Sequence, residues 1–562
     1  MRSGRLLRET AILAAAGLGC KLLGGLSKLP LAWMLGAHGI GVFQLAFTFY
    51  GLTLALAVSG FPVAASKLVA ERTAVGDSAG ARAGFRLAYA LLFAIGALAS
   101  AALYFGAPGV AALLRNPHVS GPLKATAPAV LLVALAAAYR GYFQGHRRLI
   151  PTAVSQLAEQ AVRVAAMLAL AYLLRPRGLV PAVTGASLGS TLGALAALLV
   201  VGWLYHIGGR LGGGTDGGFR RRGGGVRSRR TPGRRGRLRP VPWHPPPPAP
   251  PPAWRLRGRG PGAGALLRSL AATAAPVSAG SAVLPVTEAA VAVIVLARLQ
   301  AAGYTSLGAT HLYGELYGLA YSLVTLPAIA AAALAAALVP AVAGAVAAGD
   351  LRRAATYARS SLRLTVVGSL PAALGMYLLA APLCGLLFGV REAGAALAPL
   401  APAALLIALQ QTTTGLLQGL GRPVVPVVGM VLGGLANAAL AYWLTAIPSL
   451  GIAGAAGAVV GGYAVAVGVN LACLLGRPGF WPALGDAAAK PFIACWLMAL
   501  AVQRAHPALA RTLGQGVGVL LAVVVGSAVY AAAMLVMRGF SRQELELVPG
   551  IGAGLARRFG KR

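Results

Sequence analysis

Charged side chains are scarce in this 562-residue chain, and acidic ones are the scarcest. Asp, Glu, Lys and Arg make up 11% of the residues, with 12 acidic against 49 basic side chains. A soluble domain averages about 25% charged residues, so the composition excludes an ordinary soluble globular protein. A net charge of +37 would suggest a nucleic-acid partner in a soluble protein. We expect no nucleic acid here, because membrane proteins retain basic residues on their cytoplasmic side.

Cysteine is also rare, and the sequence carries no recognisable catalytic motif. There is no Walker loop, no HExxH, and no GxSxG in a strand–turn–helix context. The many GxxxG-like spacings indicate closely packed helices. We therefore predict that the protein is not an enzyme and has no cofactor, apart from a coupling cation or the membrane potential. The four cysteines lie in apolar stretches without metal-ligand spacing, which predicts neither disulfides nor a metal site; they are Cys20, Cys384, Cys473 and Cys495.

The sequence contains instead a succession of apolar runs, each roughly twenty residues long. Hydrophobic residues make up 58% of the chain, and its mean hydropathy is +0.75. A run of about 18 or more apolar residues can cross a bilayer as a helix. These runs are too long and too continuously apolar for barrel strands, so we predict an all-α polytopic membrane protein with about 14 transmembrane helices. The predicted spans lie near residues 10–35, 41–66, 84–106, 123–145, 152–174, 180–206, 265–297, 310–338, 358–388, 395–418, 424–446, 450–475, 488–503 and 514–537.

Basic residues alternate between successive connections, which predicts the topology. With the N-terminus inside, the even-numbered connections are rich in Lys and Arg, and the odd ones hold few. The sequence Arg175-Pro176-Arg177 is the clear exception. Fourteen spans return the C-terminus to the side of the N-terminus, so we expect a multi-pass protein with both termini cytoplasmic.

Residues 207–263 are a different kind of sequence, dominated by Gly, Arg and Pro. Apolar residues are too few there to bury a core, which predicts a disordered cytoplasmic loop with a polyproline II segment at Pro245–Pro252. Its basic residues would attract anionic lipid headgroups; the alternative is a solvated spacer.

The parts on either side of this loop look like repeats of each other. A Gln-Gly segment at Gln144 precedes Pro151, and a similar segment at Gln418 precedes Pro426, six predicted spans later. An even number of spans per repeat gives two parallel repeats, which usually place the substrate path between them. We predict an N-terminal lobe at 1–206, a C-terminal lobe at 264–475, a terminal helix pair at 476–537 and a cytoplasmic tail at 538–562.

Ionisable and polar residues inside the spans are the candidate functional residues, because a charge at the bilayer centre costs roughly 3 kcal/mol or more. Lys21 and Lys28 share one helical face; they either line a cavity or extend to the membrane interface. Glu159 and Arg163, four residues apart, predict a structural ion pair. Cationic groups in a cavity would suit a phosphate-bearing substrate, and carboxylates a counter-ion or an internal ion pair. The candidate substrate-binding residues are Lys21, Lys28, Arg140, Gln144, Glu288, Glu315, Gln410 and Gln411.

Several stretches resemble the polysaccharide-synthesis, stage V sporulation protein B-like family of exporters. This family belongs to the multidrug/oligosaccharidyl-lipid/polysaccharide superfamily, which includes the murein lipid II flippase. The resemblance implies fourteen helices in two six-helix lobes plus a terminal pair, a central cavity and alternating access. Lys21 fills a place that is cationic in the murein flippase. The stretches that carry the resemblance include LLRETAILAAAGLGCKLLGGLSKLPLAWMLGAHGIGVFQLAF, YRGYFQGHRRLIPTAVSQLAEQAVRV and LVTLPAIAAAALAAALVPAVA.

The resemblance also implies a function and a location. The expected protein is a monomeric flippase for an undecaprenyl-linked oligosaccharide or peptidoglycan precursor, in a bacterial cytoplasmic membrane, serving spore-cortex or cell-wall synthesis. One alternative is a cation-coupled multidrug-type antiporter. Another is a non-transporting membrane scaffold of cell-wall assembly, with the Arg- and Pro-rich loop as its docking element.

The predicted topology can be tested at the loop. A cysteine placed at Ser228 should react with a membrane-impermeant thiol reagent only after the cells are opened, because the even-numbered connections are predicted to be cytoplasmic. Labelling of that cysteine from outside intact cells would contradict the topology.

Overall fold

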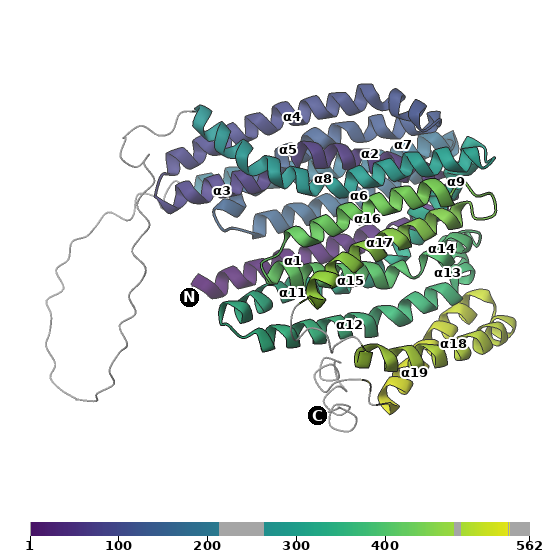
Figure 1. The fold of residues 1–562 in the computed structure, drawn as a ribbon. Coiled ribbons are helices and arrows are strands. Elements are labelled where there is room, and N and C mark those ends of the chain that lie inside the picture. Colours follow the sequence, from purple (N-terminus) through teal and green to yellow (C-terminus); the bar gives the residue numbers. More distant parts are fainter. Residues whose placement is uncertain (1, 213–262, 477–484, 538, 540–562) are drawn as a thin grey trace, which may run out of the picture.

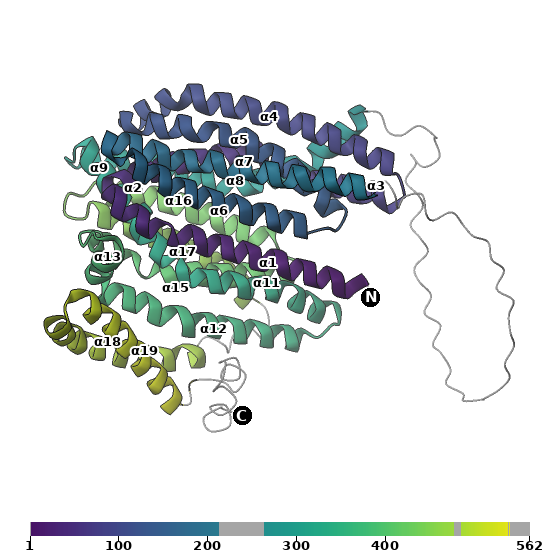
Figure 2. The same ribbon diagram turned by 180° about the vertical axis from the view of Figure 1, so that it is seen from behind.

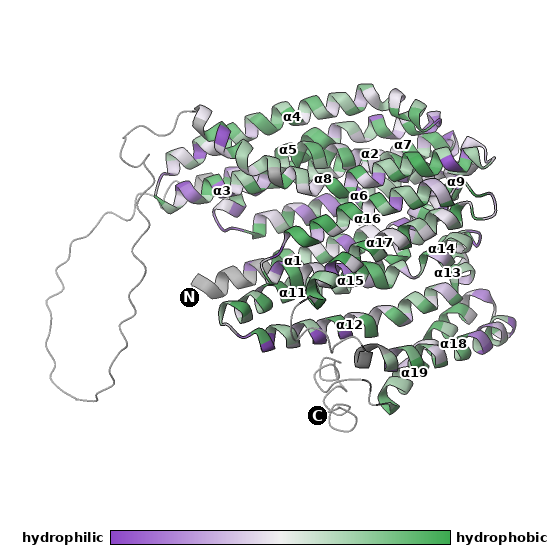
Figure 3. Cartoon of the chain, viewed as in Figure 1, coloured by the Kyte–Doolittle hydropathy of each residue, from purple (hydrophilic) through white to green (hydrophobic). Residues whose placement is uncertain are grey.

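The computed structural model describes residues 2–212, 263–476, 485–537 and 539, and every regular element in these ranges is helical. Most of the predicted loop and nearly all of the predicted tail lie outside the described residues. The long helices run roughly alongside one another (Figure 1). Apolar residues cover most of their length (Figure 3). Helices satisfy their own backbone hydrogen bonds, so they suit a lipid environment.

The first seven helices precede the loop, and one of them, α2, contains a sharp turn. Gly36, with φ of 66°, interrupts α2 at the predicted connection between the first two spans. Such a φ is readily adopted only by glycine. These helices are α1 (Arg2–Leu26), α2 (Lys28–Val58), α3 (Phe61–Ala74), α4 (Ser78–Leu113), α5 (Ser120–Gly145), α6 (Ile150–Leu174) and α7 (Leu179–Gly212), with short 3-10 turns at Pro117–Val119 and Arg175–Arg177.

The helices after the loop are more often broken. The predicted span at 310–338 is divided into four pieces, one of which is a π-helix, η4. The helices are α8 (Ala263–Ala301), α9 (Ser306–Tyr313), η4 (Gly314–Ala320), α10 (Tyr321–Val324), α11 (Leu326–Ala347), α12 (Leu351–Leu378), α13 (Ala380–Phe388), α14 (Gly394–Leu400), α15 (Ala403–Gly419), α16 (Val424–Leu444) and α17 (Ile452–Leu475). A last pair, α18 (Gly485–Leu513) and α19 (Gln515–Val536), packs against α12 and α13.

The all-α, multi-pass architecture is confirmed, but the count of about 14 spans is not. Among the described residues, 12 helical stretches are long and apolar enough to cross a membrane, or up to 13 if the bent pair α14 and α15 is one span. Part of the difference lies at Ala15–Ala74, which counts once although it is 60 residues long. A single crossing needs only about 20 residues.

The helices before the loop touch the helices after it at the end of the bundle away from the start of α1 (Figure 1). A Cβ on Gly41 of α2 would lie 2.2 Å from the carbonyl oxygen of Thr310, and one on Gly314 would lie 2.1 Å from that of Ala37. The Nδ2 of Asn116 also donates to Oγ1 of Thr310 at 2.8 Å in a buried position. The backbones therefore touch here, which only glycine allows.

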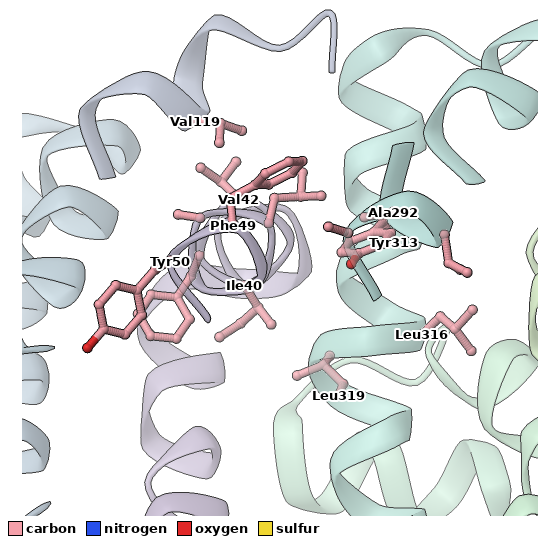
Figure 4. Close-up of a cluster of buried hydrophobic side chains, with 14 of the residues drawn as sticks. Ile40, Val42, Phe49, Tyr50, Val119, Ala292, Tyr313, Leu316 and Leu319 are labelled. Atoms are coloured by element: carbon pink, nitrogen blue, oxygen red, sulfur yellow. The ribbon is translucent and has the colours of Figure 1, made fainter. Parts of the chain in front are cut away.

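An apolar cluster extends this contact along α2. Figure 4 shows Ile40, Val42 and Phe49 of α2 with Tyr313 and Leu316 nearby. The side chains of Leu316 and Leu319 are fully buried. Because such packing leaves no room for water, the helices before and after the loop are closed against each other along this part of α2, and a pocket lined by His38, His118 and Leu307 lies beside the contact.

A bulky residue at Gly41 should open this contact. In Gly41→Val, the new side chain would overlap the backbone of α9, so α2 must move away. Spin labels at the exposed Leu113 and Leu307, in a variant without the native cysteines, should report a longer and broader distance than in the parent.

Gly51→Val on the same helix is the matched control, because a Cβ there meets no atom within 4 Å. An unchanged distance in Gly41→Val would show that the close contact is not what holds the helices before and after the loop together at this end.

Candidate functional site

A cleft of about 550 Å³ lies in the middle of the bundle, between the helices before and after the loop. Its walls come chiefly from α1, α2 and α6 on one side, and from α8, α10 and α11 on the other. Among the lining residues, Lys21, Lys28 and Arg163 are basic and Glu288 is the single carboxylate. The cleft therefore carries an excess of positive charge.

The three basic side chains of the cleft come from α1, from the first residue of α2 and from α6. α1 ends at Leu26 and α2 starts at Lys28, which is half-buried, whereas Lys21 is exposed. The Nζ of Lys28 donates to Oε1 of Gln44 at 3.3 Å. Lys28 also interacts electrostatically with Glu288. One lysine is thus held by partners, and the other is freely accessible from the cleft.

The predicted ion pair between Glu159 and Arg163 is wrong. Oε2 of Glu159 instead accepts a hydrogen bond from Nη2 of Arg140 at 2.7 Å. Nε of Arg140 also donates to Oγ of Ser155 at 3.0 Å. The reason is tertiary: Arg140 reaches Glu159 across the α5–α6 contact, which a sequence spacing on one helix cannot reveal.

Both arginines therefore differ from their predicted roles. Arg163 donates to Gln160, and both side chains line the cleft. Arg140, a predicted substrate-binding residue, is not among the residues that line it. The sequence did offer a signal for Gln160, a polar residue in an apolar span, next to Glu159.

The other predicted binding residues are divided between different surroundings. Gln411 lines the cleft, and Gln410 lines a second cavity beside it. Gln144 lines neither of these cavities. Glu315 is 2% exposed and lies on η4 with Oε1 3.6 Å from Nδ1 of His311. It does not line either cavity, so the prediction that it binds substrate in the cleft is not supported by its position.

The second cavity has a volume of about 110 Å³ and is lined largely by helices after the loop. It shares Gln44, Glu288 and Tyr317 with the cleft, so the two spaces lie side by side. The hydroxyls of Tyr321 and Tyr463 are hydrogen-bonded at 2.8 Å. Across the described part of the chain, no cluster of three or more His, Cys, Asp or Glu side chains could hold a metal ion.

Two family models match the chain, one on each side of the loop. The polysaccharide biosynthesis protein model matches residues 6–220, and the MatE model matches residues 278–443. Stage V sporulation protein B of Bacillus subtilis (strain 168) is 34% identical over 194 residues, and lipid II flippase MurJ of the same organism is 33% identical over 211 residues. These alignments cover 34% and 35% of this chain, and only 38% and 39% of the two relatives.

Solved structures match over a larger part of the chain. Lipid II flippase MurJ in an inward closed conformation matches with a TM-score of 0.66 at 12% identity, over 94% of this chain and 98% of that one. The chain thus shares its fold with solved transporters of the multidrug/oligosaccharidyl-lipid/polysaccharide superfamily. An inward-facing multidrug resistance MATE transporter of this superfamily matches with a TM-score of 0.59 at 14% identity, over 84% and 95% of the two chains. At these identities the structural matches show the fold of the superfamily.

The ion pair between Arg140 and Glu159 should stabilise this superfamily fold. Both side chains are largely buried, with relative exposures of 12% and 20%. Arg140→Ala leaves a buried carboxylate unpaired, so it should lower the free energy of unfolding by about 3 kcal/mol. Thermal unfolding of the purified protein in detergent would measure the loss.

Two further variants separate the ion pair from general effects. Arg140→Ala combined with Glu159→Gln should recover most of the stability, and Arg163→Ala alone should change it little. An Arg163→Ala variant as unstable as Arg140→Ala would contradict this assignment.

Proposed function

We propose that the protein is a flippase for a lipid-linked oligosaccharide or peptidoglycan precursor and works by alternating access. The observation that carries the proposal is the excess of positive charge in the central cleft. Lys21, Lys28 and Arg163 line it against one carboxylate, Glu288. Charges inside a membrane bundle are costly, so they are usually found where they face a cavity and act on a substrate.

A pyrophosphate-linked headgroup matches this cleft in charge and in size. Its oxygens accept hydrogen bonds from ammonium and guanidinium groups, which are stronger than those between neutral partners. A volume of about 550 Å³ lies within the usual range for ligand sites, roughly 300–1,000 Å³. The lipid tail would remain in the membrane, because only the headgroup needs a polar path.

The state of the cleft also fits this function. At the end of the bundle away from the start of α1, the helices before and after the loop are closed against each other by backbone contacts at Gly41 and Gly314. On the face of the bundle seen in Figure 2, α1 lies between α6 and α11 and carries the exposed Lys21. With cytoplasmic termini, as proposed from the distribution of basic residues, the cleft would receive substrate from the cytoplasmic side.

The relatives support the substrate class. One is named as a lipid II flippase and another as a stage V sporulation protein. We propose a role in cell-wall or spore-cortex synthesis for the protein, as a monomer in a bacterial cytoplasmic membrane. A coupling cation or the membrane potential would supply the energy.

A second candidate function is cation-coupled export of small amphipathic compounds. It is favoured by the fold shared with a multidrug resistance transporter and by Glu288, a carboxylate that borders both cavities. This candidate predicts that the carboxylate matters more than the lysines. The flippase predicts the reverse.

Removal of the lysines distinguishes the two candidates. Lys21→Ala and Lys28→Ala should each weaken headgroup binding by about 1.5–3 kcal/mol, or roughly ten- to a hundredfold, because each removes a hydrogen bond to a charged group. The measurement is translocation of an undecaprenyl-linked substrate in proteoliposomes containing equal amounts of protein.

Lys124→Ala is the matched control, because this lysine lies over the ring of Tyr104, away from the cleft. Full translocation by the double variant Lys21→Ala, Lys28→Ala would remove the lysines from the mechanism. The antiporter would be favoured if removal of the Glu288 carboxylate abolished export of cationic drugs while the lysine variants had no effect on the lipid substrate.

A further inference from the structure

The smaller cavity lies beside the cleft and differs from it in charge. Four tyrosines line it, together with amide side chains and one carboxylate. None of the lining residues is basic, so an anionic group such as pyrophosphate would have no counter-charge there. Its lining residues include Gln44, Thr48, Glu288, Tyr313, Tyr317, Tyr321, Gln410, Asn437 and Tyr463.

Two polar atoms at this cavity have no hydrogen-bond partner among the described residues. They are the hydroxyl of Tyr317 and Oδ1 of Asn437, and both are buried. Buried polar groups are nearly always hydrogen-bonded, so these two unpaired atoms at one cavity call for an explanation. A ligand that has hydroxyl groups could satisfy both.

Three of the four tyrosines come from one irregular stretch of helix. Tyr317 lies on the π-helix η4, between Tyr313 and Tyr321, and all three tyrosines line the cavity. Side chains four residues apart lie on the same face of a helix, so the three rings form one wall. Short π-helical segments occur frequently at functional sites.

The opposite walls are held close by glycines. A Cβ on Gly433 of α16 would lie 2.5 Å from the carbonyl oxygen of Gly462 on α17. A Cβ on Gly434 would lie 2.8 Å from side-chain atoms of Thr287 on α8. These contacts fix α8, α16 and α17 around the cavity, which therefore has a defined shape.

We propose that this cavity binds a neutral sugar ring of the lipid-linked substrate, while the cations of the cleft bind its pyrophosphate. Aromatic faces pack against the C–H groups of a sugar, and amide and hydroxyl groups bond its hydroxyls. The inference rests on the proposed function. It divides recognition between two surfaces: the cationic wall lies mostly on helices before the loop, and the sugar site mostly on helices after it.

This division would link binding to the movement of the two groups of helices. A pyrophosphate held by Lys21 and Arg163 and a sugar held by Tyr317 and Asn437 join surfaces from both sides of the cleft. A substrate without its sugar would engage only the cationic side. The sugar site would then prevent the transport of bare carrier lipid.

The test compares two kinds of lipid on the full chain reconstituted in nanodiscs. The first is undecaprenyl pyrophosphate, and the second carries one additional hexose or N-acetylhexosamine. The parent protein should bind at least one glycosylated lipid more tightly than the bare lipid. Tyr317→Phe and Asn437→Ala should each reduce this preference by about two- to tenfold, the usual worth of a hydrogen bond. Asn437 lines the cavity and not the cleft, so Asn437→Ala should leave binding of the bare lipid unchanged.

The variants include their own check on folding. Tyr317→Phe preserves the ring and removes an unpaired buried hydroxyl, so the melting temperature should not fall. Tyr377→Phe, at an exposed tyrosine of α12, is the matched control and should leave the preference intact. Lys28→Ala should weaken the binding of both kinds of lipid.

The outcomes separate the inference from the function on which it rests. If the parent binds the bare and glycosylated lipids equally, or if the cavity variants leave the preference unchanged, the sugar site is wrong while the flippase stands. An equal loss of binding of both lipids in Asn437→Ala would also overturn the sugar site. If the parent binds neither kind of lipid, the proposed function fails and the inference with it.

Discussion

The cost of an unpaired charge or polar group in a bilayer is the constraint on which this structure depends. It requires the backbone to form helices, and it leaves ionisable side chains only where a partner or a cavity receives them. Arg140 and Glu159 meet this requirement by pairing with each other. Lys21, Lys28 and Arg163 meet it by facing a shared cleft, so the same constraint that shapes the bundle also concentrates charge at its centre.

Irregular backbone appears where the helices serve the cleft and its closure. Gly36 turns the chain between two crossings, the break near Ser27 precedes Lys28, and the π-helix η4 carries Tyr317. Each departure from α-helical geometry leaves backbone groups that neighbouring helices must shield. These breaks lie between packed helices, where non-helical backbone is tolerated.

In the proposed function, the cleft and the tyrosine-lined cavity would bind two different parts of one ligand. The cleft supplies long, flexible cations that can follow an anionic group as the helices move. The cavity supplies stiff aromatic rings held by close helix contacts at Gly433 and Gly434. Flexible charge on one side and rigid shape on the other is an arrangement suited to a substrate that must be held, carried and released.

The sequence alone determined the helical class, the membrane location and most helix positions, because apolar length and glycine or proline punctuation are local properties. It also identified Lys21, Lys28 and Glu288, since an ionisable residue in an apolar run is conspicuous by itself. Only the tertiary structure decided which charges meet. Arg140, and not Arg163, pairs with Glu159, and Glu315 lies near His311 outside the lining of the cleft. Pairing across helices depends on how each helix is rotated and how far it is shifted along its neighbours. The tyrosine-lined cavity was equally hidden, since its walls come together from helices far apart in the chain.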